Sequence, residues 1–324
     1  MNVLLVGLGR WGANHLRILR SLPVTLYCAD IDPAPLAALV RSGFPAARTT
    51  RDAFALLDRI DAAVLATPAP SHFELARHLL EAGKDVLVEK PLALTAAEAQ
   101  TLTDLAARTG RILQVGHIFL YDPASLWLRD AVRRDDFGRL RLLRGNFSGF
   151  KRPRADGGVS FADAVHFAAL FNFIVGQAPQ KVTGHLADFL GRGLDDQSLI
   201  VLDYADGTRA QIETGYHVPG KTREITITGE RLAALCDFNV AQYKIRTFEL
   251  RHERQVDGAF AAVEGKVNQL EFPPAEPLLE ELRAFLACVE TRAAPLADGR
   301  IGTDAVRVIE AAIQSAREER TVHL

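Results

Sequence analysis

The sequence contains few cysteines and no long apolar run, and both absences narrow its class. Its three cysteines, Cys28, Cys236 and Cys288, lie far apart and form no CxxC or Cys/His ligand pattern. Such sparse usage suits a reducing compartment, where thiols act as small buried hydrophobic groups. No stretch of about 18 apolar residues occurs, so we expect no transmembrane helix. The N-terminal residues 1–6 run straight into a predicted strand and a glycine turn and leave no room for a signal peptide, which makes a cytoplasmic protein the expectation.

The sequence also lacks an excess of charge of either sign. Lys and Arg number 38 against 40 Asp and Glu, which gives a formal net charge of −2. Because like charges form no block, neither nucleic acid nor an anionic membrane is an expected partner. No His, Asp and Glu residues stand at metal-ligand spacing, and no serine lies in a nucleophile-elbow motif. We therefore expect chemistry that needs no metal.

Length and hydrophobic pattern predict two domains, because single cores stop growing at roughly 250–300 residues. In residues 1–120, short apolar runs alternate with helical patterns, which is typical of a parallel sheet covered by helices. Strands are predicted at 3–6, 24–29, 62–67, 85–89 and 112–115, and helices at 11–22, about 73–80, and 95–109. The prediction for residues 1–120 is a doubly wound Rossmann domain that binds NAD(P).

After residue 120 the strands follow one another. They are predicted at 140–147, 181–188, 198–204, 210–216 and 224–228, with helices at 123–134, 160–175, 278–291 and 303–317. Asp206-Gly207 between two strands is a hairpin-turn signal. For residues 121–324 we predict an α+β domain with a largely antiparallel open sheet, which binds substrate and joins subunits. The C-terminal helices either stay within this domain or pack back on the first domain.

A glycine-rich turn follows the first predicted strand. In Gly7-Leu8-Gly9-Arg10-Trp11-Gly12, the first glycine permits a tight turn, the second lets the backbone approach a pyrophosphate, and the third lets the helix pack closely. The helix N-terminus that follows offers N–H groups and partial positive charge to phosphates. This pattern predicts a dinucleotide site.

Asp30 ends the second predicted strand, where an acidic residue binds the ribose diol. A carboxylate there repels a 2′-phosphate, which favours NAD over NADP. Arg10 is able to neutralise such a phosphate, so NADP remains open.

Further motifs extend the pattern over nearly the whole chain. They are Thr67-Pro68-Ala69-Pro70-Ser71-His72, Glu89-Lys90-Pro91, Val115-Gly116-His117, Asp122-Pro123-Ala124 and Gly302-Thr303-Asp304-Ala305. Together with the glycine turn and His15, they resemble the Gfo/Idh/MocA family of sugar and polyol oxidoreductases. The resemblance implies a cofactor site formed by Gly7, Gly9, Arg10, Trp11, Gly12, Asp30, Thr67, Pro68, His72, Glu89 and Lys90.

Lys90 is the first candidate catalytic residue. It stands at the carboxyl end of a predicted parallel strand, the edge at which open α/β sheets bind ligands. Its ammonium group can donate a hydrogen bond to the reacting oxygen and stabilise negative charge there. Without the surrounding motifs, a lysine before a turn would be a solvated surface residue. In the resembled family the Lys-Pro bond is often cis.

Asp163 and His166 are the second candidate pair, in the apolar segment 161–174. Three residues apart on a helix, they share one face. An unperturbed imidazole, with a pKa near 6.5, suits proton exchange at neutral pH. We predict that His166 is the general base and that Asp163 binds a substrate hydroxyl or orients the imidazole. The commonest family spacing is four, and the family's frequent aspartate three residues after the histidine is Ala169 here.

The predicted substrate site contains Lys90, His117, Tyr121, Arg152, Asp163 and His166. His117 either takes part in proton transfer or packs beneath the nicotinamide. The basic loop 151–158 either closes over substrate, meeting a phosphate or carboxylate, or is a solvated loop. The resemblance implies a small-molecule substrate with a secondary alcohol (a sugar, a polyol or a nucleotide sugar) and a homodimer or homotetramer. The alternative function is a non-catalytic ligand sensor on the same fold, which has no evident use for both Lys90 and His166.

Overall fold

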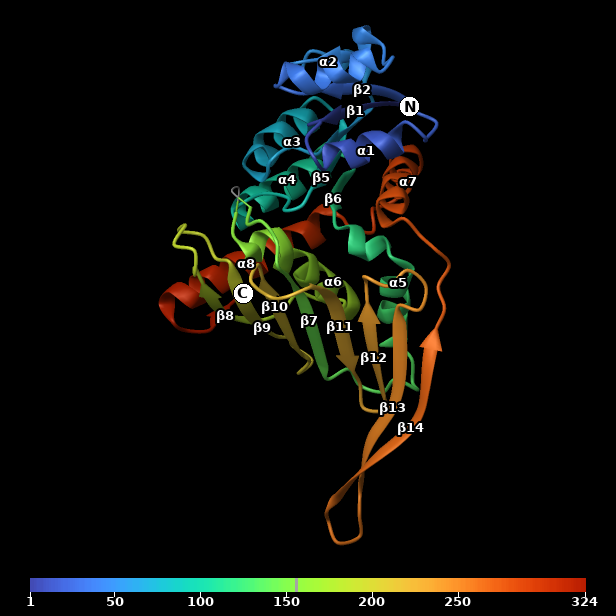
Figure 1. The fold of residues 1–324 in the computed structure, drawn as a ribbon, viewed down its shortest axis with the longest axis vertical. Helices are drawn as coiled ribbons and strands as arrows, with labels where there is room; N and C mark the ends of the chain where they lie inside the picture. Colours follow the sequence, from blue (N-terminus) through green and yellow to red (C-terminus); the bar gives the residue numbers. More distant parts are fainter. Residues whose placement is uncertain (155–156) are drawn as a thin grey trace. The chain divides into compact units, whose positions relative to one another are not determined.

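The computed structural model describes residues 1–154 and 157–324, which divide into two compact units (Figure 1). The first unit contains Met1–Tyr121 and Glu276–Val306, and the second contains Asp122–Ala275 and Arg307–Leu324. We predicted a single division after residue 120. In the structure, the later segment Glu276–Val306 also belongs to the first unit. Two residues of the predicted basic loop 151–158, Ala155 and Asp156, lie outside the described residues.

The first unit is built on a six-stranded sheet in the order β3-β2-β1-β4-β5-β6, with every neighbouring pair parallel. This is the doubly wound order of a Rossmann fold, so the predicted fold class is confirmed. The strands are β1 (Asn2–Val6), β2 (Thr25–Ala29), β3 (Thr49–Thr50), β4 (Ala62–Leu65), β5 (Asp85–Glu89) and β6 (Leu113–Gly116). The central strands β4 and β5 are buried throughout, as expected for strands covered on both faces.

Local sequence signals set the helix ends of this unit. Its helices are α1 (Gly12–Leu19), α2 (Pro33–Arg41), α3 (His72–Glu81), α4 (Ala96–Thr109) and α7 (Pro277–Thr291). Thr95 caps α4 by accepting a hydrogen bond from the Glu98 N–H at 3.2 Å. The sequence pattern did not predict α2, although Asp32 caps it and Pro33 occupies its first position.

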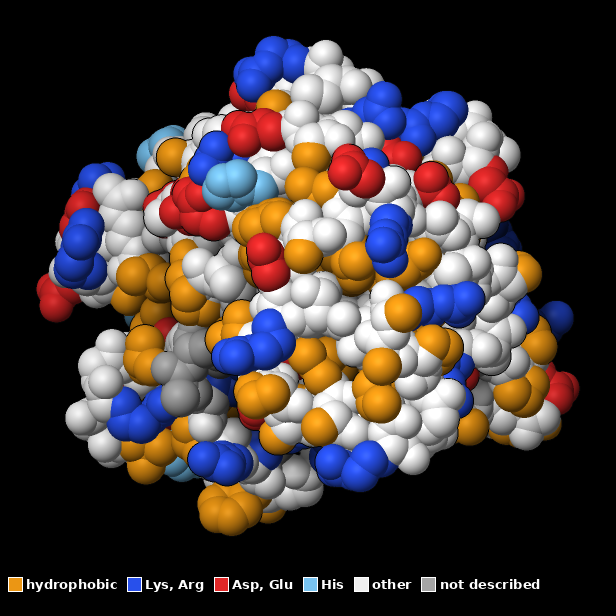
Figure 2. Space-filling view, turned by 90° about the horizontal axis from the view of Figure 1, so that it is seen from above, with side chains coloured by type: hydrophobic (Ala, Val, Ile, Leu, Met, Phe, Trp, Pro, Cys, Tyr) orange, Lys and Arg blue, Asp and Glu red, His pale blue; other side chains and the backbone are white. Residues whose placement is uncertain are grey.

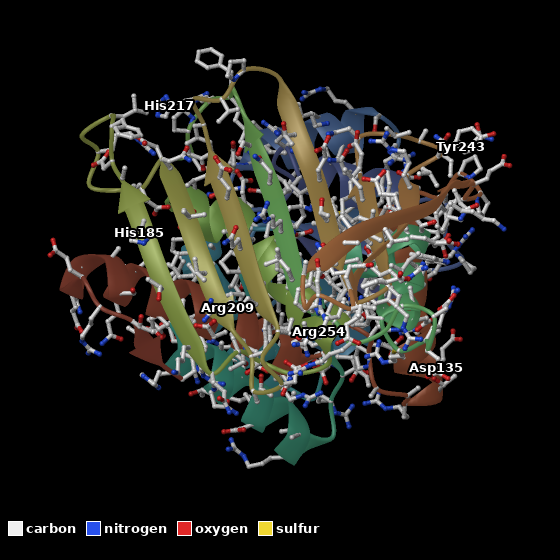
Figure 3. The ribbon with its side chains drawn as sticks, turned by 90° about the horizontal axis from the view of Figure 1, so that it is seen from below. Asp135, His185, Arg209, His217, Tyr243 and Arg254 are labelled. Carbon is white, nitrogen blue, oxygen red and sulfur yellow. The ribbon has the colours of Figure 1, made fainter. Side chains whose placement is uncertain are left out.

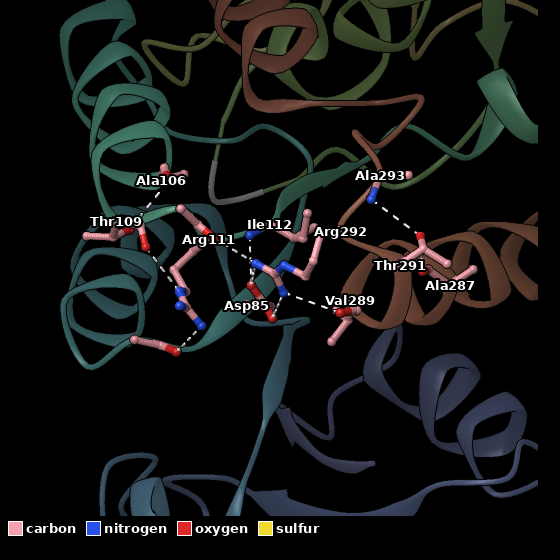
Figure 4. Close-up of polar contacts among 12 residues, drawn as sticks. Asp85, Ala106, Thr109, Arg111, Ile112, Ala287, Val289, Thr291, Arg292 and Ala293 are labelled. Carbon is pink, nitrogen blue, oxygen red and sulfur yellow. Dashed lines mark hydrogen bonds and ion pairs between the residues drawn. The ribbon is translucent and has the colours of Figure 1, made fainter.

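An ion pair connects α7 to the Rossmann sheet (Figure 4). Arg292 ends α7 and donates to both carboxylate oxygens of Asp85, at 2.7 and 3.0 Å, and to the Gly110 carbonyl at 2.7 Å. The Asp85 side chain is buried at the start of β5 and also accepts from the Ile112 N–H at 2.8 Å. Such a bidentate pair fixes orientation as well as distance. Apolar residues of α7, Leu282 and Phe285 among them, also pack into the core of the first unit.

The second unit is built on a nine-stranded sheet in the order β14-β13-β12-β11-β7-β10-β9-β8-β15. Its strands are β7 (Leu142–Gly149), β8 (Lys181–Ala187), β9 (Gln197–Asp203), β10 (Arg209–Gly215), β11 (Lys221–Thr228), β12 (Leu232–Asp237), β13 (Ile245–Arg254), β14 (Phe260–Leu270) and β15 (Val322–His323). The pair β7–β10 is parallel and the other neighbours are antiparallel, which confirms the predicted largely antiparallel sheet. No strand was predicted beyond residue 228, so β12 to β15 were missed.

Helices cover one face of this sheet. The helix α6 (Val165–Val175) packs on β7, where a Cβ added to Gly145 would lie 2.5 Å from the Phe167 ring. The helix α8 (Gly299–Glu318) packs its later turns on β8, because a Cβ on Gly184 would lie 2.3 Å from the Ala312 carbonyl oxygen. Figure 3 shows the opposite face, on which His185 and Arg209 lie. The unit also contains α5 (Pro123–Ala131), which Asp122 caps.

Charges of both signs are interspersed on the face shown in Figure 2. Ion pairs also form along single helices: on α3, Arg77 pairs with Glu74 at 2.7 Å and with Glu81 at 3.0 Å. Among the described residues, no helix is both long and apolar enough to cross a membrane.

Candidate active site

The glycine turn between β1 and α1 has two tightly packed positions and one open position. A Cβ on Gly7 would lie 2.8 Å from the Ala66 carbonyl oxygen, and a Cβ on Gly12 would lie 2.0 Å from the Gly7 oxygen. Gly7 also has a positive φ of 92°. At Gly9, by contrast, an added Cβ would meet nothing within 4 Å. The turn therefore needs glycine twice for its own packing, and it leaves space at Gly9 that fits an approaching pyrophosphate.

Asp30 lies beside this turn, directly after β2. Its carboxylate accepts hydrogen bonds from the Leu8 N–H at 2.7 Å and from the Asp32 N–H at 2.9 Å. These bonds hold negative charge next to the glycine turn, which fits a ribose diol and disfavours a 2′-phosphate.

Glu89, at the end of β5, joins the glycine-turn helix to the strand that carries Lys90. The Trp11 indole N–H donates to its Oε1 atom, and His15 Nε2 lies 2.7 Å from the same oxygen. Burial raises the pKa of Glu89, but the bonds from His15 and Trp11 and the charge of Lys90 outweigh it, so its pKa is lowered. Glu89 is therefore a buried carboxylate that fixes both segments of the predicted cofactor site.

His72 links two of the predicted cofactor loops. One ring nitrogen, Nδ1, lies 2.7 Å from the Pro91 carbonyl oxygen, and Nε2 lies 2.9 Å from the Thr67 carbonyl oxygen. Burial is the main reason that the pKa of His72 is lowered. The Lys90-Pro91 bond that this histidine supports is cis. These contacts give His72 a supporting role, and its direct contact with a cofactor stays a prediction.

His117 and Tyr121 follow β6 and are both buried. Burial, and then the charge of Lys90, lower the pKa of His117 to about 3, so a neutral imidazole lies near the Lys90 ammonium. The Tyr121 hydroxyl accepts a hydrogen bond from the Ala297 N–H at 3.4 Å inside the first unit. Substrate contact by either residue stays a prediction.

Sequence reasoning missed Glu281, which α7 places in the interior of the first unit. Its residue exposure is 0%, and neither carboxylate oxygen has a hydrogen-bond partner among the described residues. Burial and the charge of Glu89 raise the pKa of Glu281 well above its usual range, which favours the neutral acid. Helical spacing gave a signal, because Glu281 shares its face with Leu278 and Phe285.

In the second unit, Asp163 and His166 lie at the start of one helical segment. The single predicted helix 160–175 begins as a π-helix over Ser160–Ala164 and continues as α6. Asp195 caps it, accepting from both the N–H and the hydroxyl of Ser160 at 2.8 Å. π-Turns are frequent at functional sites. Asp163 and His166 are 7% and 8% exposed, so the helix presents two buried polar groups among apolar residues.

The aromatic ring of Phe147, on β7, contacts His166 and also Lys151, which in turn pairs with Asp163. The His166 ring stacks on it at 5.7 Å between centroids, with planes 11° apart. Lys151 Nζ lies 4.9 Å from the ring centroid and 2.5 Å from Asp163 Oδ2. Asp163 thus pairs with a loop lysine. Arg152, the predicted loop residue, is exposed, and its contact with substrate stays a prediction.

A second cation contacts the same ring. Arg223 on β11 lies directly opposite Phe147 in the β7–β11 register, with its guanidinium carbon 4.3 Å from the ring centroid. Sequence reasoning missed this residue, although alternation with the buried Ile225 and Ile227 places it on the helix-covered face.

Comparisons with known proteins agree with this arrangement. Residues 1–117 match the model of an oxidoreductase family with an NAD-binding Rossmann fold, GFO_IDH_MocA. Residues 129–324 match the C-terminal alpha/beta domain of the same oxidoreductase family.

Individual relatives align over most of the chain. An inositol 2-dehydrogenase of Rhizobium meliloti is 24% identical, over 99% of this chain and 98% of its own. The scyllo-inositol 2-dehydrogenase (NAD(+)) of Bacillus subtilis is 28% identical, over 66% of this chain and 67% of its own. The structure of UDP-N-acetylglucosamine 3-dehydrogenase GnnA from Acidithiobacillus ferrooxidans shares the fold with a TM-score of 0.84, at 22% identity over 98% of each chain.

The open space at Gly9, the carboxylate of Asp30 and the Glu89 contacts fit a bound dinucleotide, and the family model covers both parts of the chain. This chain belongs to the Gfo/Idh/MocA family and is an NAD(P)-dependent oxidoreductase.

Proposed function

We propose that this enzyme transfers hydride between NAD and a secondary alcohol of a sugar, polyol or nucleotide sugar. The observation that carries the proposal is the position of Lys90, which directly follows β5 and is next to Glu89, the buried carboxylate that holds the glycine-turn helix. His166, buried at the start of α6, is the candidate proton acceptor. Relatives named as inositol and nucleotide-sugar dehydrogenases support this substrate class.

The protein groups divide the chemistry between them. Lys90 donates a hydrogen bond to the alcohol oxygen and stabilises the negative charge that develops on it. His166 accepts the hydroxyl proton, and a ketone forms as the carbon loses its hydride. When bound, NAD supplies the acceptor for that hydride. Asp163, held by Lys151, binds a neighbouring hydroxyl or orients the imidazole.

The same proposal assigns the cofactor contacts. Gly7, Gly9 and Gly12 shape the pyrophosphate site, and Asp30 binds the ribose diol. Arg10, Trp11, Thr67, Pro68 and His72 complete the site, together with Glu89 and Lys90. NAD is the expected cofactor, and NADP is the tested alternative.

A substrate panel tests this function. Purified enzyme with NAD or NADP is given myo-inositol, D-xylose, D-glucose, their acidic and phosphorylated relatives, and a UDP-sugar, and formation of the reduced cofactor is followed by absorbance. We expect turnover in the panel and its loss in Lys90→Ala. Tight NAD binding without any turnover would indicate the sensor instead.

We also propose that the chain forms a homodimer or homotetramer through the open face of the nine-stranded sheet. That face includes Leu199 on β9, whose side chain is 40% exposed among polar neighbours. Light scattering at micromolar concentration tests the proposal, and a monomeric mass would overturn it.

A further inference from the structure

We propose that the substrate carries an oxyanion, a carboxylate or a phosphate, and that Arg223 and Lys151 bind it beside His166. This inference rests on the proposed function, since it names the substrate class of the same site. The residues involved form the Phe147 cluster, which consists of Phe147, Lys151, Asp163, His166 and Arg223.

The charges of the Phe147 cluster do not balance. Lys151 and Arg223 are two cations, and among residues 1–154 and 157–324 Asp163 is the carboxylate that interacts with both of them. Its Oδ2 atom is already engaged by Lys151 at 2.5 Å. The neighbouring carboxylate of Asp195 is directed to the N–H and hydroxyl of Ser160. Within the described part of the chain, the cluster therefore has one more positive charge than negative charge.

Arg223 is placed to bind the proposed oxyanion. Its guanidinium stacks over the Phe147 ring at 4.3 Å, and a ring face accepts no ordinary hydrogen bond. Its Nη1 atom is buried and has no hydrogen-bond partner among the described residues. Burial lowers the pKa of Arg223 and the charge of Asp163 raises it. Because a buried donor without a partner is costly, an arriving oxyanion would stabilise a group that the fold leaves unsatisfied.

The location of Arg223 connects this binding to the reaction. The residue as a whole is half-buried on β11, although its Nη1 atom is enclosed. The ring that it covers also stacks on His166 at 5.7 Å and contacts Lys151 at 4.9 Å. One monosaccharide with a charged substituent can cover such distances. Arg223 would then select the charged sugar and present one of its hydroxyls to His166.

Kinetics on matched probes test the proposal. D-Glucose, D-gluconate and D-glucose 6-phosphate are compared, as are myo-inositol and myo-inositol 1-phosphate, all with NAD-loaded enzyme. We expect at least one charged probe to exceed its neutral partner in kcat/KM, or in affinity measured by calorimetry, by about 10- to 100-fold. The gluconate and phosphate arms distinguish the two oxyanions. If no charged probe exceeds its neutral partner, the inference is wrong.

Variants assign the effect to Arg223. Arg223→Gln should raise KM for the charged probe by about 10- to 100-fold with little change for the neutral probe, and Arg223→Lys should restore part of the loss. Arg144→Gln, on the exposed side of β7, is the matched control and should change neither value. Equal losses for charged and neutral probes would mean that Arg223 only supports the fold. Should Arg223→Gln fail to fold, Lys151→Gln must show the same selective loss.

Calorimetry separates this inference from the proposed function. Lys90→Ala should abolish turnover while the charged probe still binds in an Arg223-dependent manner. Arg223-dependent binding without turnover in the wild-type enzyme would refute hydride transfer and retain the oxyanion site. If the wild-type enzyme turns over neutral and charged sugars equally well, and Arg223→Gln changes neither efficiency, hydride transfer is retained and the oxyanion site is refuted.

Discussion

The two units hold their candidate catalytic groups in different ways. The neighbours of Lys90 come from segments that follow adjacent strands of one parallel sheet, and Glu89 joins them through Trp11 and His15. The neighbours of His166 come from β7, the loop after it, the π-helix and β11, gathered on the ring of Phe147. Short motifs define the first site, and antiparallel strand register defines the second.

This difference also separates the charges. In the first site the charge of Glu89 is matched by hydrogen bonds from His15 and Trp11 and by the charge of Lys90. The second has more cations than carboxylates, and one donor without a partner among the described residues. A surplus of positive charge favours an anionic ligand, which the first site does not select in this way. Variants in each unit should therefore fail in different ways.

The largest effect is expected at His166. His166→Asn removes the proton acceptor, so kcat should fall by about 10²- to 10⁴-fold, with NAD affinity unchanged. Steady-state kinetics measure kcat, and titration with NAD measures the NAD affinity. His185→Asn, on the open face of the same unit (Figure 3), is the control and should keep full activity. Activity above roughly a tenth of wild type in His166→Asn would place the base elsewhere.

Lys90→Met should reduce kcat by about 10²- to 10³-fold, because it removes the donor that stabilises charge on the reacting oxygen. The matched control is Lys84→Met, which precedes the other end of β5 and donates to the Ile60 carbonyl. Steady-state kinetics give kcat and KM separately. A change in KM alone would assign Lys90 to substrate binding rather than to the chemical step.

Much of the first site could be predicted from sequence, for a geometric reason. Glu89 ends one strand of the parallel sheet, and Thr67 and His117 follow two others; the carboxyl ends of such strands meet at one edge. Spacing along the chain thus reports proximity in space. Glu281 was not predicted for two reasons. It comes from α7, far along the chain, and it directly follows another glutamate, Glu280, a pattern typical of a solvated helix face.

The second site was predictable only in part. Helical spacing located Asp163 and His166, but nothing in the sequence indicates that Arg223 faces Phe147, because the β7–β11 register sets that contact. The missed β13 and β14 are largely exposed on both faces, so they give no alternation of polar and apolar residues. The π-helix at Ser160–Ala164 likewise has no sequence signature that separates it from an α-helix.

Asp30 tests whether the first site selects its cofactor by charge. Asp30→Ala removes the carboxylate beside the glycine turn, so kcat/KM should fall about 10-fold with NAD and rise with NADP. Asp32→Ala is the control, because Asp32 caps α2; it should cost about 1 kcal/mol of stability without changing cofactor preference. An unchanged NAD-to-NADP ratio in Asp30→Ala would assign cofactor choice to other residues, Arg10 foremost.

The smallest effect concerns Glu281, and it appears in stability. Since its pKa is raised in the folded protein, the native state binds more protons than the unfolded state above the ordinary pKa of 4.5. Stability should therefore be full below that pH and fall as pH rises toward the raised pKa, by up to about 1.4 kcal/mol per pH unit. Glu281→Gln keeps the shape without the titration, so its urea unfolding free energy should stay level over this range. The exposed Glu280→Gln on the same helix should follow the wild-type slope. Parallel slopes for wild type and Glu281→Gln would show that the first unit does not bury a proton there.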